Sequence, residues 1–566
     1  MKRAWFVTAA FVAAVAVLVA VTLPPARIAL DRSRGDGTVP GVIHIHTNRS
    51  DGRSSPDEVA DAASRAGLAF IVLTDHGNAT RPPDAPVYRH GVLCLDAVEI
   101  STSGGHYVAI GLPQAPYPLA GEPRDVVDDV QRLGGFGIAA HPDSPKLEFR
   151  WTGWTAPFDG MELVNPDSGW RRRLVKPGAR PKLRLLERLF SYPFRPGETI
   201  ASVLAEPADN LSRWDALTRS RKVVGVAGAD AHAKLALMSS EPGDNRFSLP
   251  LPGYEASFRT MSVHVEPRTP LTGQAAHDAR AIVDGLRAGH VYVAVDGLAS
   301  PASFSFTADA AGRSIEEGDD LVASRLTLRV SSNAPAAFTT QVLDDGRVIA
   351  SSQQPAFSVQ ANGAGVYRVE IHATDRPGNQ PWILSNPIYA RSAASEPEAA
   401  PTPSTSKTPI FDGTNIRDWR VEHDTASSGA LAAANSGEGP MTLAYKLSAT
   451  DQTRPSVALL RNMSEGLYGN LRLGFTARAD RPMRLLVELR TGVPGTPEER
   501  WQRSVYLDQH DREALVTFDD MAPLGATRTL RPALDQIRYV MFVVDPTNTK
   551  PGAAGTVTFE RITLER

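Results

Sequence analysis

Cysteine is nearly absent from this chain, and neither sign of charge is in excess. Cys94 is the single cysteine among 566 residues, so the chain can form no intrachain disulfide and no cysteine-rich zinc site. Sixty Lys and Arg residues against 63 Asp and Glu leave a formal charge of −3, which argues against a nucleic-acid polymer as partner. The composition also excludes a disordered protein and a collagen-like repeat. At about 100–200 residues per domain, the length predicts three or four domains.

A long apolar run lies at the N-terminus. Residues 4–23 contain no charged side chain and follow Lys2 and Arg3. A helix of this length, at ~1.5 Å per residue, spans the ~30 Å core of a bilayer. We therefore expect a single-pass signal anchor over residues 1–23 in the cytoplasmic membrane, with the catalytic part outside the cytoplasm (periplasmic or at the cell surface). A cleaved signal peptide, which would make the protein secreted, is the alternative.

Short apolar strands alternate with helices in the first half of the chain. After a spacer over residues 24–40, this pattern covers residues 41–297. One expected helix begins at Ser55, whose side chain can form a capping box with Glu58, and it is followed by the apolar run 70–73, which is typical of a buried parallel strand. The alternation predicts a parallel α/β sheet or barrel.

The second half has the alternating pattern of β-strands. Residues 298–390 are expected to form an immunoglobulin-like β-sandwich, with Asp345 and Gly346 at a hairpin turn. A Pro/Ser/Thr-rich linker over residues 391–409 cannot bury a core. Residues 410–566 return to strand patterns, and we expect a jelly-roll β-sandwich there.

The start of this last module contains residues 411–413 (Phe-Asp-Gly) and Trp419. These residues and the strands that follow resemble galactose-binding-like jelly rolls of carbohydrate-active enzymes. The resemblance makes carbohydrate a candidate partner of the module. A structural or protein-docking role is the alternative.

Histidine and carboxylate residues gather where the strands of the first half are expected to end. Ten of the 13 histidines precede residue 298, and the residues in this pattern are His44, His46, Asp51, Asp75, His76, Glu99, His106, His141, Asp230 and His232. The carboxyl ends of strands in a βα barrel converge on one mouth. Imidazole and carboxylate without thiolate suit Zn, Mn or Fe. Because the donors exceed the needs of one ion, we expect two or three divalent ions.

Five ordered motifs among these residues resemble those of the PHP (polymerase and histidinol phosphatase) metallo-phosphoesterase family. They lie at residues 44–52, 73–78, 98–100, 140–143 and 228–232. The resemblance covers about residues 41–297 and implies a distorted seven-stranded, TIM-like α/β barrel with a trinuclear metal site. The expected fold class is therefore multidomain, with this barrel followed by the two β-sandwiches.

The resemblance also implies how the ligands divide. One ion would be held by His44, His46, Glu99 and Asp230. A second ion would share Glu99 and add His106 and His141. The third would be held by Asp51, His76 and His232. Asp75 is expected to orient an imidazole through its second nitrogen.

The expected reaction is hydrolysis of a phosphate ester by a metal-activated hydroxide. The residues expected to take part in catalysis are His44, His46, Asp75, Glu99, His141, Asp230 and His232. We expect Arg53, Arg171 and Arg172 to bind the phosphate, although the basic stretch over residues 170–188 could also be a solvated insertion. The substrate would be a phosphate-ester small molecule or an envelope phosphodiester.

Two other functions stay open. The same site could hydrolyse a non-phosphate bond such as an amide, and inhibition by inorganic phosphate would separate the two reactions. The PHP-like domain could also be a catalytically silent binding module, which an incomplete ligand set would favour. The chain has no Gly-rich phosphate loop and no Gly-x-Ser-x-Gly elbow, which argues against an NTPase or a serine hydrolase.

Overall fold

The computed structural model describes residues 5, 17, 22–31, 37–204, 207–236, 248–310, 312–323, 325–374, 376, 379–392, 406–435, 438–450, 455–492 and 497–566. The chain divides into two compact units. The first consists of residues 1–77, 82–113 and 130–398, and the second of residues 78–81, 114–129 and 399–566.

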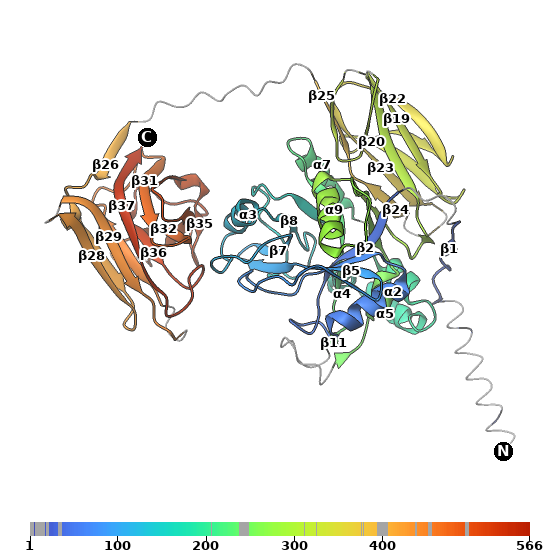
Figure 1. Cartoon of the computed structure of the whole chain (residues 1–566), viewed down its shortest axis with the longest axis horizontal. Helices are drawn as coiled ribbons and strands as arrows, with labels where there is room; N and C mark the ends of the chain where they lie inside the picture. Colours follow the sequence, from blue (N-terminus) through green and yellow to red (C-terminus); the bar gives the residue numbers. More distant parts are fainter. Residues whose placement is uncertain are drawn as a thin grey trace. The chain divides into compact units, whose positions relative to one another are not determined.

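The first unit is built around short buried strands that pair in parallel. Strand β2 pairs on one side with β3, which pairs with β5, and on the other side with β10, which pairs with β9 and then β8. Their bounds are β2 Val39–Ile45, β3 Phe70–Leu73, β5 Val92–Asp96, β8 Phe136–Ala139, β9 Gly160–Val164 and β10 Val224–Ala231. The strand expected over residues 70–73 is thus confirmed, and β2, β5 and β8 are labelled in Figure 1.

Part of this sheet system is antiparallel, which the strand–helix alternation did not predict. Strands β6 (Val98–Thr102) and β7 (Gly105–Ile110) form an antiparallel pair, and β7 pairs antiparallel with β8. An isolated parallel bridge between His76 and Glu99 links the end of β3 to β6. No helix separates β6 from β7, so the chain reverses directly. A TIM-like barrel of seven strands remains a prediction.

Helices of the first unit follow several of these strands. Their bounds are α2 Pro56–Ala66, α4 Pro166–Val175, α5 Ala179–Ser191, α6 Pro196–Val203, α7 Ala208–Thr218, α8 Tyr254–Phe258 and α9 Ala275–Ala288, and α3 (Pro123–Arg132) crosses the division between the units. The capping box of Ser55 and Glu58 is present, and Gly67 ends α2 in the left-handed conformation. The predicted helix start at Ser55 is therefore confirmed.

Residues 299–391 belong to the first unit and form two sheets. One has the order β17-β16-β19-β22, and the other contains β20, β21, β23, β24, β25 and β18. Asp345 and Gly346 have φ of 50° and 82° and join β20 (Thr339–Asp344) to β21 (Arg347–Ser352), so the predicted hairpin is confirmed. Strand β24 (Gln380–Ser385) also pairs with β14 (Val291–Ala294). The remaining strands of the first unit are β1 Ile28–Ala29, β4 Val87–Arg89, β11 Leu235–Ala236, β12 Ser248–Leu249, β13 Ser262–Val265, β15 Ala299–Ser300, β16 Phe304–Ala310, β17 Arg313–Glu316, β18 Asp320–Val322, β19 Arg325–Ser332, β22 Ala356–Asn362, β23 Gly365–Ala373 and β25 Ile388–Arg391.

The second unit contains two six-stranded antiparallel sheets that share one hydrophobic core (Figure 1). The first sheet comprises β26 Lys407–Phe411, β28 Ser428–Asn435, β29 Glu438–Lys446, β31 Arg472–Ala479, β34 Arg512–Thr517 and β37 Ala554–Glu565. The second comprises β27 Trp419–His423, β30 Val457–Asn462, β32 Met483–Thr491, β33 Arg500–Leu507, β35 Ala522–Pro523 and β36 Ile537–Val544. The chain is therefore multidomain, and its C-terminal part consists mostly of β-sheet.

Two aromatic residues of this unit bear on the predicted carbohydrate partner. Phe411 and Trp419 are buried in the core, so they stabilise the sandwich and do not offer rings to a sugar. Carbohydrate binding remains a prediction.

Arg484 of β32 is buried and ion-paired within the unit to Asp129, with 2.8 Å between Nε and Oδ2.

The predicted membrane anchor is contradicted. Residues 4–23 lie outside the described residues, apart from Trp5, Val17, Thr22 and Leu23. Across the described part of the chain, no helix has both the length and the apolar character needed to cross a bilayer. The predicted signal anchor and single-pass membrane localisation conflict with this finding.

Candidate metal centre

Three of the expected ligands lie at strained backbone positions beside the ends of strands. His44, His141 and Asp230 have φ of 65°, 49° and 47°, in the left-handed region that non-glycine residues rarely adopt. The pairing of β2 with β3 and with β10 changes register near His44 and Asp230, so the strands bulge there. Bulges of this kind redirect side chains, and backbone strain of this kind gathers at functional sites.

Glu99 lies at the centre of the cluster and faces five imidazoles. Its side chain is fully buried. Its Oε1 lies 2.8 Å from Nδ1 of His106 and 2.9 Å from Nε2 of His141. Its Oε2 lies 3.1 Å from Nε2 of His46, and nitrogens of His44 and His76 each lie 3.3 Å from it. One carboxylate can therefore bridge several ions.

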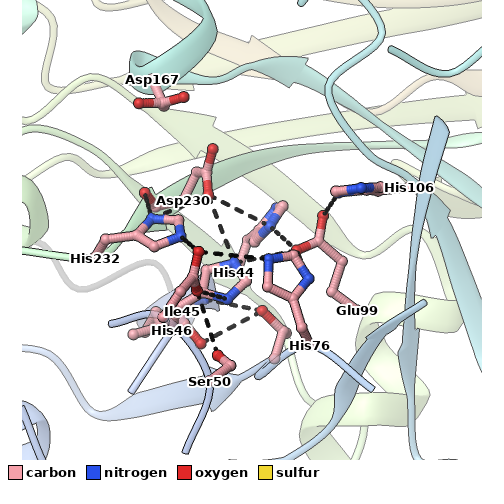
Figure 2. A network of polar contacts seen from close by, with 12 residues as sticks. His44, Ile45, His46, Ser50, His76, Glu99, His106, Asp167, Asp230 and His232 are labelled. Carbon is pink, nitrogen blue, oxygen red and sulfur yellow. Dashed lines mark hydrogen bonds and ion pairs between the residues drawn. The ribbon is translucent and has the colours of Figure 1, made fainter. Parts of the chain in front are cut away.

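Asp51 and Asp230 complete the cluster, and Figure 2 shows Asp230 beside His44 and His232. The Oδ2 atom of Asp51 lies 3.2 Å from Nε2 of His232 and 3.7 Å from Nε2 of His76. Asp230 lies 3.6 Å from Nε2 of His46 and 3.5 Å from Nδ1 of His141. The structure thus brings all nine expected ligands together.

The donor atoms of these residues fit divalent cations. Four groups have donors that all lie within 4.8 Å of one another, and the groups are His46–Asp51–His76–His232, His44–Glu99–His141, His44–His46–Asp230 and His76–Glu99–His106. Both ring nitrogens of His46, Nε2 of His44 and Oε2 of Glu99 are buried without a hydrogen-bond partner. A buried polar atom without a partner costs about 1–3 kcal/mol. Cations bound at these atoms would offset that cost.

Sequence reasoning missed Glu162 and Asn165, which hold the ligands in place. Oε1 of Glu162 lies 2.5 Å from Nδ1 of His44, so Nε2 is left to face Glu99 and Asp230. Asn165 donates from Nδ2 to Oε2 of Glu162 at 2.9 Å. A carboxylate on the second nitrogen of a metal-binding imidazole is a recurrent arrangement.

A glycine in the last motif lies against Glu162. A Cβ atom on Gly228 would lie 1.7 Å from Oε1 of Glu162. The buried carboxylate therefore requires glycine at that position of β10. From sequence alone, the acid within the apolar run 161–164 was the only mark of this residue.

Asp75 has a different role from the one expected. Its carboxylate accepts hydrogen bonds from the backbone amide and hydroxyl of Thr47, both at 2.8 Å, and from the hydroxyl of Ser50 at 2.7 Å. These contacts fix the loop that carries Asp51. Among the described residues, Asp75 contacts no imidazole, so the expectation that it orients one is wrong.

The carboxylates control the protonation of the imidazoles. Burial alone would lower the pKa of His141 and of His232, but Asp230 and Glu99 raise the pKa of His141 to about 9, and Asp51 and Asp230 do the same for His232. The pKa of His46 falls to about 4 because of burial and the neighbouring His232. Burial would raise the pKa of Glu99, yet His44 and His106 hold it well below its usual range. Cations and protons would therefore compete for the same nitrogens.

The site opens into a cleft of about 1050 Å³. Seven of the nine candidate ligands line it, and the other two, His44 and His46, are buried. Of the three arginines expected to bind phosphate, Arg171 lines the cleft, where it is ion-paired to Asp167. Arg53 instead contacts Ser248, and Arg172 pairs with Asp143 at 3.0 Å. Neither is among the lining residues.

Comparison with known proteins gives two distant relatives by sequence. The chain is 29% identical over 169 residues to a 3',5'-nucleoside bisphosphate phosphatase of Chromobacterium violaceum, a match that covers 27% of this chain and 56% of that protein. It is 24% identical over 137 residues to an uncharacterized protein of Methanocaldococcus jannaschii, covering 22% of this chain and 80% of that protein. The chain thus spans little more than half the length of the phosphatase. No family model matches it.

Two solved structures are similar to about a quarter of the chain. A family 11 carbohydrate-binding module from Clostridium thermocellum aligns over 28% of this chain and 94% of its own, with 16% identity and a TM-score of 0.23. A family 29 carbohydrate-binding module aligns over 28% and 88%, with 10% identity and a TM-score of 0.19. The site of this chain therefore holds His/Asp/Glu groups that could bind metal ions, and about a quarter of the chain is similar to that phosphatase.

Proposed function

We propose that residues 41–297, most of which belong to the first unit, form a PHP-type, metal-dependent phosphoesterase. The observation that carries the proposal is the convergence of nine His, Asp and Glu side chains on one cleft, with buried donor atoms that have no hydrogen-bond partner. The similarity to a bisphosphate phosphatase supports it. The seven-stranded barrel, the three-ion ligand set and the module boundaries at residues 297 and 390 belong to the same proposal.

The residues that would hold divalent ions (Zn, Mn or Fe) are His44, His46, Asp51, His76, Glu99, His106, His141, Asp230 and His232. When bound, such ions lower the pKa of water and polarise phosphoryl oxygens. Overall, the oxygen of water bonds to phosphorus, the ester P–O bond breaks, and the alcohol leaves with a proton. The ligand set is complete, which disfavours a catalytically silent module.

The protein's own side chains would orient the ligands and attract the substrate. Glu162 keeps the Nδ1 side of His44 occupied, and Asp75 keeps the loop of Asp51 in place. Arg171, Lys146 and Lys234 line the cleft, so their charges favour an anionic phosphate. Phosphate binding by Arg53 and Arg172 would require their side chains to leave Ser248 and Asp143.

The ligand assignment predicts that Asp230→Ala and His141→Ala each lose bound metal, because each removes a donor from the cluster. Elemental analysis of the purified variants measures this loss. His90→Ala is the control, since His90 is exposed and pairs with Asp57 away from the cluster. Unchanged metal content in both variants would refute the ligand assignment.

The reaction class is tested with a panel of phosphate monoesters and diesters on the metal-loaded protein. Release of phosphate or of the alcohol, inhibited by inorganic phosphate, is the expected result. Hydrolysis of amides or carboxylic esters that inorganic phosphate does not inhibit would favour the alternative reaction.

A further inference from the structure

The cleft is lined by apolar side chains as well as by the candidate metal ligands. Helices α4, α5 and α6, strand β11 (Leu235–Ala236) and one loop contribute branched aliphatic side chains, which are Leu174, Leu185, Leu186, Leu189, Ile200, Val203, Leu235 and Leu251. The same cleft is lined by Glu99, His141 and Asp230. Its volume of about 1050 Å³ matches the upper end of the range of about 300–1,000 Å³ for small-molecule sites. One cavity therefore joins a site for a phosphate to a surface for hydrocarbon.

Several of these side chains are exposed to a degree that is unusual for leucine. The exposed fractions are 44% for Leu174, 56% for Leu186 and 54% for Leu189. Aliphatic side chains that gather on one surface mark a binding site for an apolar group. Since they share a cleft with the candidate ligands, the group that covers them would belong to the molecule whose phosphate binds there.

Three aromatic side chains, Phe149, Trp170 and Tyr192, line the cleft. The Tyr192 hydroxyl accepts a hydrogen bond from the amide of Gly253 at 2.8 Å, and the rings of the other two contact cationic side chains. The guanidinium of Arg171 lies 4.6 Å from the centre of the Trp170 ring. The ring of Phe149 lies 5.0 Å from that of His106, with Lys146 at 4.4 Å from its centre. Recognition of a nucleobase relies on stacking against aromatic rings and on hydrogen bonds to the base edge. This lining favours an aliphatic chain over a base.

We propose, on the basis of the proposed phosphoesterase function, that the substrates are phosphate esters of long aliphatic alcohols. The phosphate lies against the cluster of His, Asp and Glu residues, and the hydrocarbon chain lies against the aliphatic residues of α4, α5 and α6. Lys182 and Arg188 also line the cleft, so its lining carries positive charge, which favours an anionic ligand.

Binding of n-alkylphosphonates tests this inference without relying on turnover, because their P–C bond is not hydrolysed. Isothermal titration of the metal-loaded protein with ethyl-, butyl- and octylphosphonate measures affinity below the concentration at which each aggregates. Each buried methylene is expected to tighten binding up to about fourfold, the equivalent of about 0.8 kcal/mol. From ethyl- to octylphosphonate, affinity should rise by at least about tenfold. Equal affinity for the three compounds would overturn the inference.

Variants of α5 test whether the effect of chain length on affinity arises in the cleft. Leu186→Gln and Leu189→Gln are expected to reduce the gain from ethyl- to octylphosphonate. Leu183→Gln is the matched control, because Leu183 lies on the same helix with 57% of its side chain exposed but does not line the cleft. An equal gain in all three variants and the wild type would contradict the proposed location.

Hydrolysis of the corresponding alkyl phosphates separates this inference from the function on which it rests. A kcat/KM that rises with chain length supports both. Hydrolysis of every ester at the same kcat/KM overturns the aliphatic site and leaves the phosphoesterase. Phosphonate affinity that rises with chain length, without hydrolysis of any ester, supports the aliphatic site and overturns the proposed function.

Discussion

The position of a single carboxylate explains much of the geometry of the metal centre. Glu99 is buried among five imidazoles. Glu162 holds one of them, His44, through its Nδ1 atom. His44 and Asp230 both have a left-handed backbone conformation, and Nε2 of His44 lies 3.7 Å from Oδ1 of Asp230. Strain of this kind costs about 1–3 kcal/mol per residue, and the surrounding pairing of β2, β3 and β10 maintains it.

Glu162→Gln should weaken metal binding, since the amide would hold His44 less firmly than the carboxylate does. The expected loss of affinity is about 10–100-fold, measured by competition with a metal-binding dye. Asp284→Asn, at an exposed position of α9, is the control and should bind metal as the wild type does. If Glu162→Gln also binds as the wild type does, Glu162 does not position the ligand.

Asp296 should make the stability of the chain depend on pH. Burial raises its pKa to about 6, although the hydroxyl of Ser262 donates a hydrogen bond to it at 2.6 Å. Because the folded pKa exceeds the ordinary value of 3.8, the folded chain binds the proton more tightly. Its contribution is present below about pH 4 and is lost as the pH rises through about 6. The difference amounts to at most roughly 3 kcal/mol.

Asp296→Asn removes this ionisation and tests it. Relative to the wild type, the free energy of unfolding of the variant should increase between pH 4 and pH 7, as measured by urea denaturation at each pH. A constant difference between the two proteins over this range would mean that Asp296 does not titrate with a raised pKa.

At the residue scale, the sequence motifs predicted which side chains would meet, because histidines and acids follow recognisable strands. They could not predict Glu162, since one acid in an apolar run has no distinguishing neighbour. Nor could they predict that Arg53 and Arg172 would pair with Ser248 and Asp143. The partners of long, flexible side chains depend on tertiary contacts, which the spacing of residues in the sequence does not determine.

At the scale of elements, local signals predicted strands and caps well. The capping box that begins α2 and the two-residue turn before β21 depend on neighbouring residues only. The antiparallel pair β6–β7 was missed because a direct hairpin and a crossover have similar apolar runs, and only the connection between them differs. The pairing of β14 with β24 joins segments about 90 residues apart, which no local pattern reveals.

A buried ion pair joins β23 to helix α7 within the first unit. Arg368 donates to Asp215 from Nε at 2.7 Å and from Nη2 at 2.9 Å, and it also contacts Glu370. Arg368→Met would leave two carboxylates buried without their cation. Such a change typically costs about 3–5 kcal/mol.

Urea denaturation of the full chain measures this loss of stability. Arg347→Met, at an exposed position of β21, should change the free energy of unfolding by no more than about 0.5 kcal/mol. If Arg368→Met is as stable as Arg347→Met, the ion pair does not hold β23 to α7.

At the scale of the whole molecule, composition and linkers predicted several β-rich and α/β parts, and the structure has two compact units. The hydropathy of residues 4–23 led to a membrane anchor that the described residues do not support. The lone cysteine and the excess of histidine in the first half were more informative, because they restricted any metal site to imidazole and carboxylate ligands.

The most direct test of the metal-dependent phosphoesterase measures the metal-to-protein ratio and the release of phosphate from esters on the same preparation, for the wild type and Glu99→Gln. We predict that the wild type retains at least two divalent ions and hydrolyses phosphate esters, and that Glu99→Gln loses both metal and activity. A wild-type protein that retains its ions and releases phosphate from no ester, or a Glu99→Gln variant that keeps both, would contradict the proposed function.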